Sequence, residues 1–365
     1  MRNFRGLSTF PLAAQFCTVD LIRDLMPNIA PSLRRILPPL ALILAAAPAV
    51  ADDYGRITLT EENDSIYFDD DQAYTQGFEF AYLGPDVAAE SGWAAPFDGL
   101  ANIGLFDTGS EVSRRYQIIL GQSIFTPEDT STEDPDPEDR PYAGWAYGGV
   151  SLIQDTDRRR LDNVELLVGI VGPAAQGRPT QNDWHQFIGV DTANGWDRQL
   201  HNEPGFMLTY ERKYRFIQPI AGGLAVDAIP EAGVTLGNVM TYGEVGTMLR
   251  FGRNLEADYG PNRIRPSLSG TSYFNADYLE DPFGFYFYVG AQGRAIAQNI
   301  FLDGNTWRDS RSVDKEHFVG DLTGGVALFW SNAVKLDAGF TYRTEEFEGQ
   351  DEDAKFANIN LTVGF

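Results

Sequence analysis

The chain has few residues that support thiol or imidazole chemistry. Its 365 residues include one cysteine, Cys17, and three histidines. Cys17 lies in an N-terminal segment that we expect to be removed. A mature chain without thiols excludes cysteine catalysis and cysteine-ligated metal, and it suits an oxidising compartment. Basic residues are scarce too, with 28 Lys and Arg against 52 Asp and Glu and a formal net charge of −24. This acidity argues against nucleic acid as a partner.

The chain also lacks a long apolar run. After residue 51 no stretch reaches 18 apolar residues, so no transmembrane helix is expected there. The apolar residues 36–48 follow Arg34 and Arg35 and precede Ala49-Val50-Ala51. A basic segment, a short apolar segment and small residues at a cleavage site form a signal peptide. We therefore expect residues 1–51 to be a signal peptide and residues 52–365 to be the mature domain.

The stretch before Met26 is unusual for a signal peptide, because it is long and carries Asp20 and Asp24. Starting at Met26 gives a signal of normal length. We expect Met26 to be the true start. The alternative is an unusually long signal peptide, which leaves the mature protein unchanged.

The last ten residues, 356–365, carry the strongest structural pattern. Ile359, Leu361, Val363 and Phe365 alternate with small or polar residues, and this period of two is that of a strand. An exposed apolar strand at the edge of a soluble sheet invites aggregation. A membrane barrel has no edge, faces lipid and places aromatics at the interface. The pattern predicts the C-terminal strand of such a barrel; the alternative is the last strand of a soluble sandwich.

Further segments alternate in the same way. Aromatic residues make up 13% of the chain, and we count roughly a dozen candidate strands near the ~10 residues that a tilted membrane strand needs. They include residues 76–83, 116–122, 206–216 and 284–290, and a hairpin of residues 323–330 and 333–342 around Ser331 and Asn332. The prediction is an all-β fold in one domain: a closed antiparallel transmembrane β-barrel of about 12 strands.

Three polar clusters interrupt this pattern and are not typical of a passive barrel. The first holds Glu62, Asn63 and Asp64, with Asp69–Asp71 and Tyr74-Thr75-Gln76-Gly77 soon after. The second spans residues 121–127 and continues to Asp139-Arg140-Pro141-Tyr142-Ala143-Gly144-Trp145. The third spans residues 181–189, with Gln181, Trp184 and His185, and continues to residues 194–204.

These clusters resemble, in their order, the signatures of the outer-membrane lipid A 3′-O-deacylase family (LpxR-like). The resemblance runs from about Glu62 to about Tyr210. It implies a twelve-stranded barrel that removes the 3′-acyloxyacyl group of lipid A. It also implies a site between the barrel wall and the outer leaflet, and dependence on calcium. One departure is Ser65, which stands where some family members carry a second acidic residue.

The chemistry of ester cleavage points to His185. No Gly-x-Ser-x-Gly motif is present, which argues against an α/β-hydrolase serine. Imidazole is the side chain best matched to proton transfer near neutral pH. His185 resembles the catalytic histidine of the family, and we interpret it as the general base that deprotonates water. The alternative is a capping or interface histidine.

Five further residues complete the predicted site. Asn63 and Asp64 offer the oxygen ligands that Ca²⁺ prefers, and the resemblance assigns them to the metal and oxyanion side; an Asx turn is the alternative. Thr75 is expected to hydrogen-bond the substrate or a ligand carboxylate. Gln181 lies four residues before His185; in a strand both would share a face, so its amide would orient the imidazole or the water. Asp191 is a further candidate for the cation site.

Some polar and aromatic residues outside this set also suggest roles. Asp139 and Arg140 predict a structural ion pair, or Arg140 meets a lipid A phosphate. Tyr142, Trp145, Trp184 and Trp196 are candidate interfacial anchors.

Two other functions compete with a deacylase. One is a passive pore or adhesin whose polar clusters line the lumen. The other is an outer-membrane phospholipase, for which Ser123 is the formal candidate nucleophile. The expected partners are lipid A or lipopolysaccharide and membrane lipids. We expect a monomer in the bacterial outer membrane, with its active site toward the outer leaflet.

Overall fold

The computed structural model describes residues 55–64, 73–107, 111–266, 272–331 and 333–365. They belong to one compact unit, Pro48–Phe365. The expected signal peptide, Asp69–Asp71 and Asn332 of the predicted hairpin lie outside the described residues. No helix among the described residues has the length and apolar character that a membrane-spanning helix needs.

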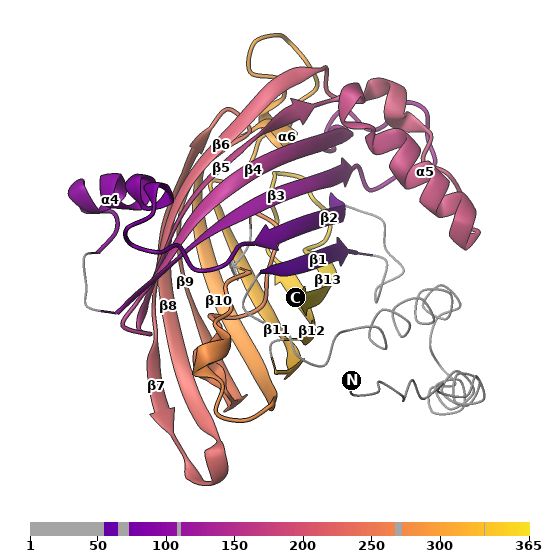
Figure 1. Cartoon of the computed structure of the whole chain (residues 1–365). Helices are drawn as coiled ribbons and strands as arrows, with labels where there is room; N and C mark the ends of the chain where they lie inside the picture. Colours follow the sequence, from indigo (N-terminus) through magenta and orange to yellow (C-terminus); the bar gives the residue numbers. More distant parts are fainter. Residues whose placement is uncertain (1–54, 65–72, 108–110, 267–271, 332) are drawn as a thin grey trace, which may run out of the picture. The chain divides into compact units, whose positions relative to one another are not determined.

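The described residues form a single antiparallel sheet (Figure 1). Its strands are β1 (Arg56–Asn63), β2 (Ala73–Leu83), β3 (Val112–Thr126), β4 (Ala143–Thr156), β5 (Arg160–Val171), β6 (Glu203–Tyr214), β7 (Phe216–Pro219), β8 (Ala225–Gly237), β9 (Met240–Arg253), β10 (Phe283–Asn299), β11 (Phe318–Trp330), β12 (Val334–Arg343) and β13 (Ala354–Gly364). The helices are α4 (Ala95–Asn102), α5 (Gly177–Ile188) and α6 (Ile300–Asp303), with short 3-10 turns η1 (Gly92–Ala94), η2 (Pro173–Ala175), η3 (Gly195–Arg198), η4 (Ala221–Gly223), η5 (Leu255–Ala257) and η6 (Ala276–Tyr278).

The sheet closes on itself as a twelve-stranded barrel, as predicted. Apart from β6 and β7, consecutive strands pair with each other; β1 pairs with β13, and β6 pairs with β8. β6 and β7 pair with β8 in one continuous register, from Met207 opposite Gly237 to Phe216 opposite Ala228. They therefore act as one strand of the barrel. The predicted strand segments lie within β2, β3, β6–β7, β10, β11 and β12.

The two ends of the barrel differ in what they carry. β1 begins and β13 ends at one end, which we call the terminal rim. Because neighbouring strands are antiparallel, β1, β3 and β5 all end at the opposite rim, which carries α5 and which we call the α5 rim. The polar clusters that follow β1, β3 and β5 are thus gathered at the α5 rim.

Side-chain alternation separates a polar lumen from an apolar outer face. On β13, the lumen-facing Asn360 donates to the carbonyl of Asn262 at 2.8 Å, while Ile359, Leu361 and Val363 take the alternate positions. Phe365 stacks on Tyr82 with ring centroids 6.2 Å apart. The alternation therefore places the predicted row of β13 outward, with Ile359 and Val363 half-buried and Leu361 only 4% exposed.

The lumen is filled by ion pairs and by part of the β9–β10 connection. Arg263 Nε donates to Glu62 Oε1 at 2.6 Å, and Arg265 pairs with Glu165 at 2.8 Å and Glu211 at 2.7 Å. A cavity of about 20 Å³ lies beside these arginines, which is room for about one water molecule. This packing does not suit an open pore.

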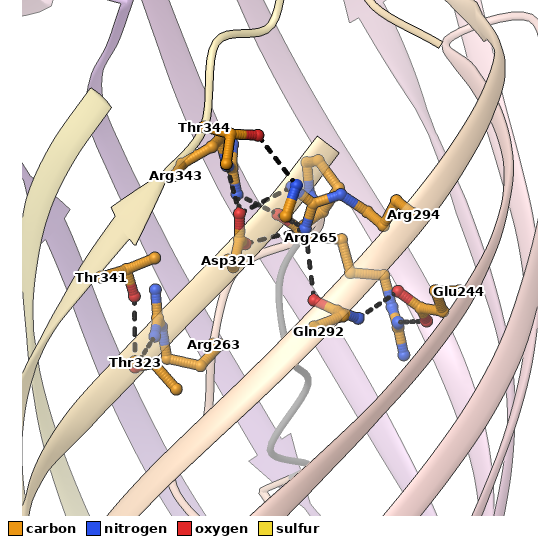
Figure 2. Close-up of polar contacts among 12 residues, drawn as sticks. Glu244, Arg263, Arg265, Gln292, Arg294, Asp321, Thr323, Thr341, Arg343 and Thr344 are labelled. Atoms are coloured by element: carbon orange, nitrogen blue, oxygen red, sulfur yellow. Dashed lines mark hydrogen bonds and ion pairs between the residues drawn. The ribbon is translucent and has the colours of Figure 1, made fainter. Parts of the chain in front are cut away.

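Figure 2 shows a second part of the lumen network, on β9–β12. Asp321 lies between Arg294, at 2.8 Å, and Arg343, at 2.9 Å. All three side chains are at most 2% exposed. Buried charges of this kind are stable only when they are paired. Removal of the shared carboxylate would leave Arg294 without a carboxylate partner and Arg343 with only Glu346, at 3.5 Å.

Candidate active site on the outer face of the barrel

The segment that carries His185 is a helix, and the strand expected there is wrong. α5 begins after Gln176, which is in the left-handed region with φ 60°, and Pro179 lies in its first turn, where a missing N–H is tolerated. It ends at Gly189, whose φ of 82° is left-handed and whose N–H donates to the His185 carbonyl at 2.8 Å. This is a glycine C-cap. Positions 181 and 185 still share a face, because residues i and i+4 are also neighbours on a helix.

α5 packs on the outside of the barrel wall. On β3, Ser123 and Phe125 line the lumen, so Gln122, Ile124 and Thr126 take the outward positions. Gln122 donates to the carbonyl of Ala175 at 2.6 Å, just before α5. A Cβ at the outward Gly144 of β4 would lie 3.2 Å from the backbone nitrogen of Gly177. The glycine thus permits close approach of the start of α5 to β4. Figure 1 shows α5 at the ends of these strands.

His185 is held in a defined tautomer. The side chain is 6% exposed, and its Nδ1 lies 2.6 Å from the carbonyl oxygen of Asp191. A carbonyl only accepts, so Nδ1 carries the proton, and Nε2 has the lone pair in the neutral ring. Trp184 and Phe187 pack together beside it with centroids 5.7 Å apart, and Phe187 is 55% exposed. The helix therefore presents an aromatic surface next to a buried, oriented imidazole.

Gln181 connects α5 to the segment that contains Trp196. Its Oε1 accepts from Trp196 Nε1 at 2.8 Å, and Trp196 packs on Tyr142 with centroids 4.9 Å apart. Asn182 exchanges two hydrogen bonds with the backbone of Ala193, at 3.2 and 3.0 Å. These contacts fix α5 against η3 and the start of β4. Trp196 was not among the predicted site residues; its role as a buried donor depends on the fold of the loop.

Asn63, Asp64 and Thr75 lie together at the same rim. Glu62 points into the lumen toward Arg263, so Asn63 is outward on β1. Asp64 donates its backbone N–H to the carbonyl of Thr75 at 3.3 Å. Both Asn63 (6% exposed) and Asp64 (2%) are buried.

A bulge in β2 sets the position of Thr75. The β2–β3 register shifts between Tyr74 and Gln76, and bulges of this kind redirect side chains next to active sites. Thr75 Oγ1 lies 2.6 Å from Thr126 Oγ1 on β3. Thr126 was missed as a site residue because nothing in the sequence shows the bulge.

β3 connects the two groups. Thr126 contacts Thr75, and Ile124, two residues earlier on the same outward face, packs in one cluster with Tyr142 and Trp196 beneath α5. The structure therefore brings Asn63, Asp64, Thr75, Gln181 and His185 to one rim, with Asn63 and Thr75 in outward positions on their strands and α5 outside the wall. This arrangement suits a substrate that approaches from the membrane.

The residues available for a cation are mainly oxygen donors of Asn63 and Asp64. No group of three or more His, Cys, Asp or Glu that could hold a metal occurs among the described residues. The predicted metal ligand Asp191 has an exposed side chain, and its carbonyl contacts His185. The buried carboxylate and amide of Asp64 and Asn63 fit the donor type that Ca²⁺ takes, alongside carbonyls and water.

Several secondary predictions are corrected. The Asp139 carboxylate accepts from the backbone N–H groups of Glu128 and Arg140, at 2.7 and 2.6 Å. The Arg140 guanidinium instead pairs with Glu346 at 3.4 Å at the lumen mouth and is 1% exposed, so a lipid phosphate does not reach it there. Burial lowers the pKa of Arg140 and raises that of Asp139.

The predicted interfacial anchors are mostly wrong. Tyr142, Trp145 and Trp196 are at most 4% exposed, and only Trp184 remains at the surface. Ser123 lines the lumen at 1% exposure, whereas His185 is outside the wall. The two are therefore on opposite sides of the sheet and do not form a Ser–His pair.

The sequence and the fold were compared with known proteins. The family model described as outer membrane protein LpxR matches residues 38–365. The solved structure of LpxR from Salmonella typhimurium matches with a TM-score of 0.68 and 18% identity, over 85% of this chain and all of that chain. The β domain of the Bordetella autotransporter BrkA matches with a TM-score of 0.40 and 12% identity, over 85% of this chain and 98% of that chain.

No curated protein matches the sequence. The structural likeness to LpxR is one of fold, and the family match covers most of the chain, including each residue of the candidate site. The chain belongs to the LpxR family of outer-membrane proteins.

Proposed function

We propose that the protein is a calcium-dependent ester hydrolase that removes the 3′-linked acyloxyacyl group from lipid A. The observation that carries the proposal is the placement of His185. Its ring is buried on the outer side of the barrel wall, with Nδ1 bonded to the Asp191 carbonyl. Nε2 of the neutral ring then has the lone pair that a general base requires.

The residues take distinct roles in this proposal. His185 accepts a proton from a water molecule, whose oxygen bonds to the ester carbonyl carbon; the proton then passes to the departing alkoxide, giving a fatty acid and a free hydroxyl. Gln181, fixed by Trp196 at 2.8 Å, keeps the face of α5 that carries His185 in place. Thr75, held by Thr126 at 2.6 Å, offers a hydroxyl to the substrate or to a ligand carboxylate.

Asn63 and Asp64 are the residues that would hold Ca²⁺, with Asp191 as a weaker candidate. A bound Ca²⁺ would polarise the ester carbonyl and stabilise negative charge on its oxygen. The proposal rests on the buried oxygen donors of Asn63 and Asp64, at 6% and 2% exposure.

The placement of the site favours a lipid substrate over solute passage. A pore would need an open lumen, whereas Arg263 and Arg265 are ion-paired inside it. A Ser–His phospholipase would need Ser123 on the side of His185. We further propose that the α5 rim faces the outer leaflet, because the candidate site lies at that rim and the proposed lipid A substrate lies in that leaflet. We also propose a monomer, because one chain supplies all these residues.

Mass spectrometry of lipid A tests the activity. Cells that express the protein should lose the mass of the 3′ acyloxyacyl group, and cells that express His185→Asn should not. Intact lipid A in the presence of the folded protein would refute a deacylase. Release of fatty acid from phospholipids alone would support the phospholipase instead.

A further inference from the structure

The β2–β3 connection forms a strap over the outer side of the barrel at the terminal rim. Residues 84–107 of this strap contain η1 and α4. Ser91 caps η1 by accepting from the Trp93 N–H at 3.2 Å, and Pro96 lies at the start of α4. Figure 1 shows α4 beside the strands of the barrel. This segment takes no part in the proposed active site, which is at the opposite rim.

Beneath the strap lies a polar row on the outer face. Arg114 is opposite Gln154, Gln154 is opposite Asp162, and Asp162 is opposite Arg212, so the four residues form one line across β3–β6. Asp162 accepts from Arg212 Nε at 2.6 Å and from Arg160 Nε at 2.7 Å. Charged groups in outward positions are costly next to hydrocarbon unless they are satisfied within the protein.

The strap provides hydrogen-bond acceptors and an ion-pair partner for the polar groups of this region. The carbonyl of Leu105 accepts from Tyr210 Oη at 3.1 Å and from Arg212 Nη2 at 3.0 Å. Asp107 accepts from Gln154 through its carbonyl at 3.0 Å and from Arg160 through its carboxylate at 2.8 Å.

The α4 end of the strap contributes a further ion pair. Asp98 pairs with Arg114 at 2.8 Å. Asp162 is fully buried although its position is outward. The polar side of the strap therefore faces the barrel.

The other side of the strap is apolar and open. Phe97 is buried against Tyr116, with centroids 5.1 Å apart, and Trp93 packs edge-on to the same ring at 6.1 Å. Trp93 remains 72% exposed, and Ile103, just after α4, remains 69% exposed.

The exposed side chains continue the lipid-facing wall. On the same strands, Ile118, Val150, Leu166 and Leu208 form the next exposed apolar row toward the barrel centre. At the same rim, Phe365 stacks on Tyr82, as expected of an aromatic girdle. Two side chains expose roughly 300 Å² at most, well below the roughly 800 Å² per partner of a stable protein interface.

We propose that the strap is an interfacial membrane anchor, with Trp93 and Ile103 inserted at the headgroup–acyl boundary of the phospholipid leaflet. The partner is phospholipid, which occupies the periplasmic leaflet; this leaflet assignment rests on the sidedness proposed above. Amphipathic segments that lie in the membrane plane bind through apolar area of this kind. The lipid contact itself can be measured without any reference to catalysis.

A single-cysteine label tests the contact. The full chain with Cys17→Ser has no other cysteine, so Ile103→Cys gives one site for an environment-sensitive fluorophore. Asp309→Cys, at an exposed position in the β10–β11 connection, is the matched control. Both proteins are reconstituted in phosphatidylethanolamine–phosphatidylglycerol vesicles, with and without lipids brominated near the headgroup. Circular dichroism confirms that each variant retains its strand content.

The label at position 103 should emit at shorter wavelength than the label at position 309. It should be quenched several-fold more by brominated lipid than by aqueous iodide, and the control should show the reverse. Equal iodide quenching at both positions would overturn the anchor. Energy transfer between labelled copies at position 103, with no lipid quenching, would overturn it in favour of a protein contact.

Discussion

Replacement of His185 separates its proposed chemistry from its structural role. In the protein, Nδ1 of this ring donates to the Asp191 carbonyl at 2.6 Å, in the turn that follows α5. His185→Ala removes both this hydrogen bond and the base. His185→Asn is the sharper change, because its amide nitrogen is as many bonds from the backbone as Nδ1. The amide keeps a donor for Asp191 but accepts no proton.

The two effects differ in size. Loss of a positioned general base lowers a rate by about 10²–10⁴-fold, which corresponds to about 3–5 kcal/mol of transition-state stabilisation. Loss of the hydrogen bond to Asp191 contributes only about 1 kcal/mol to local stability. Both variants should therefore lose the same large part of the rate. Only His185→Ala should also loosen the turn of residues 189–191.

Single-turnover release of fatty acid from lipid A measures the rate, and hydrogen exchange of the Gly189 and Val190 amides measures the turn. Both amides donate to the His185 carbonyl, at 2.8 and 2.9 Å. Lipid A binding should change little, since Trp184 and Phe187 supply the apolar contact. If His185→Asn keeps close to full activity, the ring orients the loop and is not the base.

Three further outcomes are expected. Chelation of Ca²⁺, Asn63→Ala or Asp64→Ala should each abolish fatty-acid release while circular dichroism stays unchanged; full turnover in the double variant would remove the pair from the site. The rate should fall in acid, because a protonated imidazole accepts no proton, and a flat pH–rate profile would exclude it as base. Asp321→Ala leaves Arg294 and Arg343 buried without their shared carboxylate. Denaturant unfolding should therefore show that the free energy of unfolding falls by about 3–5 kcal/mol. A fall of less than about 1 kcal/mol would show that water compensates the two guanidinium charges.

The barrel was predictable because its signal repeats on every strand. In β6, Phe206, Leu208 and Tyr210 occupy one face and are more exposed than their neighbours, as the period of two requires. Register follows from this alternation, since a slip by one residue would turn the apolar row into the lumen. The same alternation predicts that polar side chains pair inside the lumen, but it does not say which residues pair. The partner of Glu62 is Arg263, 201 residues away, and no local pattern encodes that contact.

The helix α5 of the candidate site was not predictable from the same alternation. Residues 177–188 are mostly polar. The aromatic residues Trp184 and Phe187 obscure the spacing of apolar residues that indicates a helix. The signals that decide the helix are local ones, Pro179 in the first turn and Gly189 at the C-cap. Those signals predict a helix of this length without saying where it packs. Its position depends on Gly144, a strand glycine whose missing side chain lets α5 approach.

Outward polar residues provide a sequence signal that was missed at the terminal rim. A barrel strand that places Asp162 or Asn63 toward lipid conflicts with its surroundings unless another segment covers it. At the terminal rim the cover is the strap, whose Leu105 and Asp107 bond to the row that includes Asp162. At the α5 rim, the outward Gln122 donates to the carbonyl of Ala175 just before α5, and Asn63 is buried at the same end. Local conflicts of this kind are expected at functional sites. Polar residues in lipid-facing positions of a predicted barrel therefore indicate where covering segments, and the sites they form, should be sought.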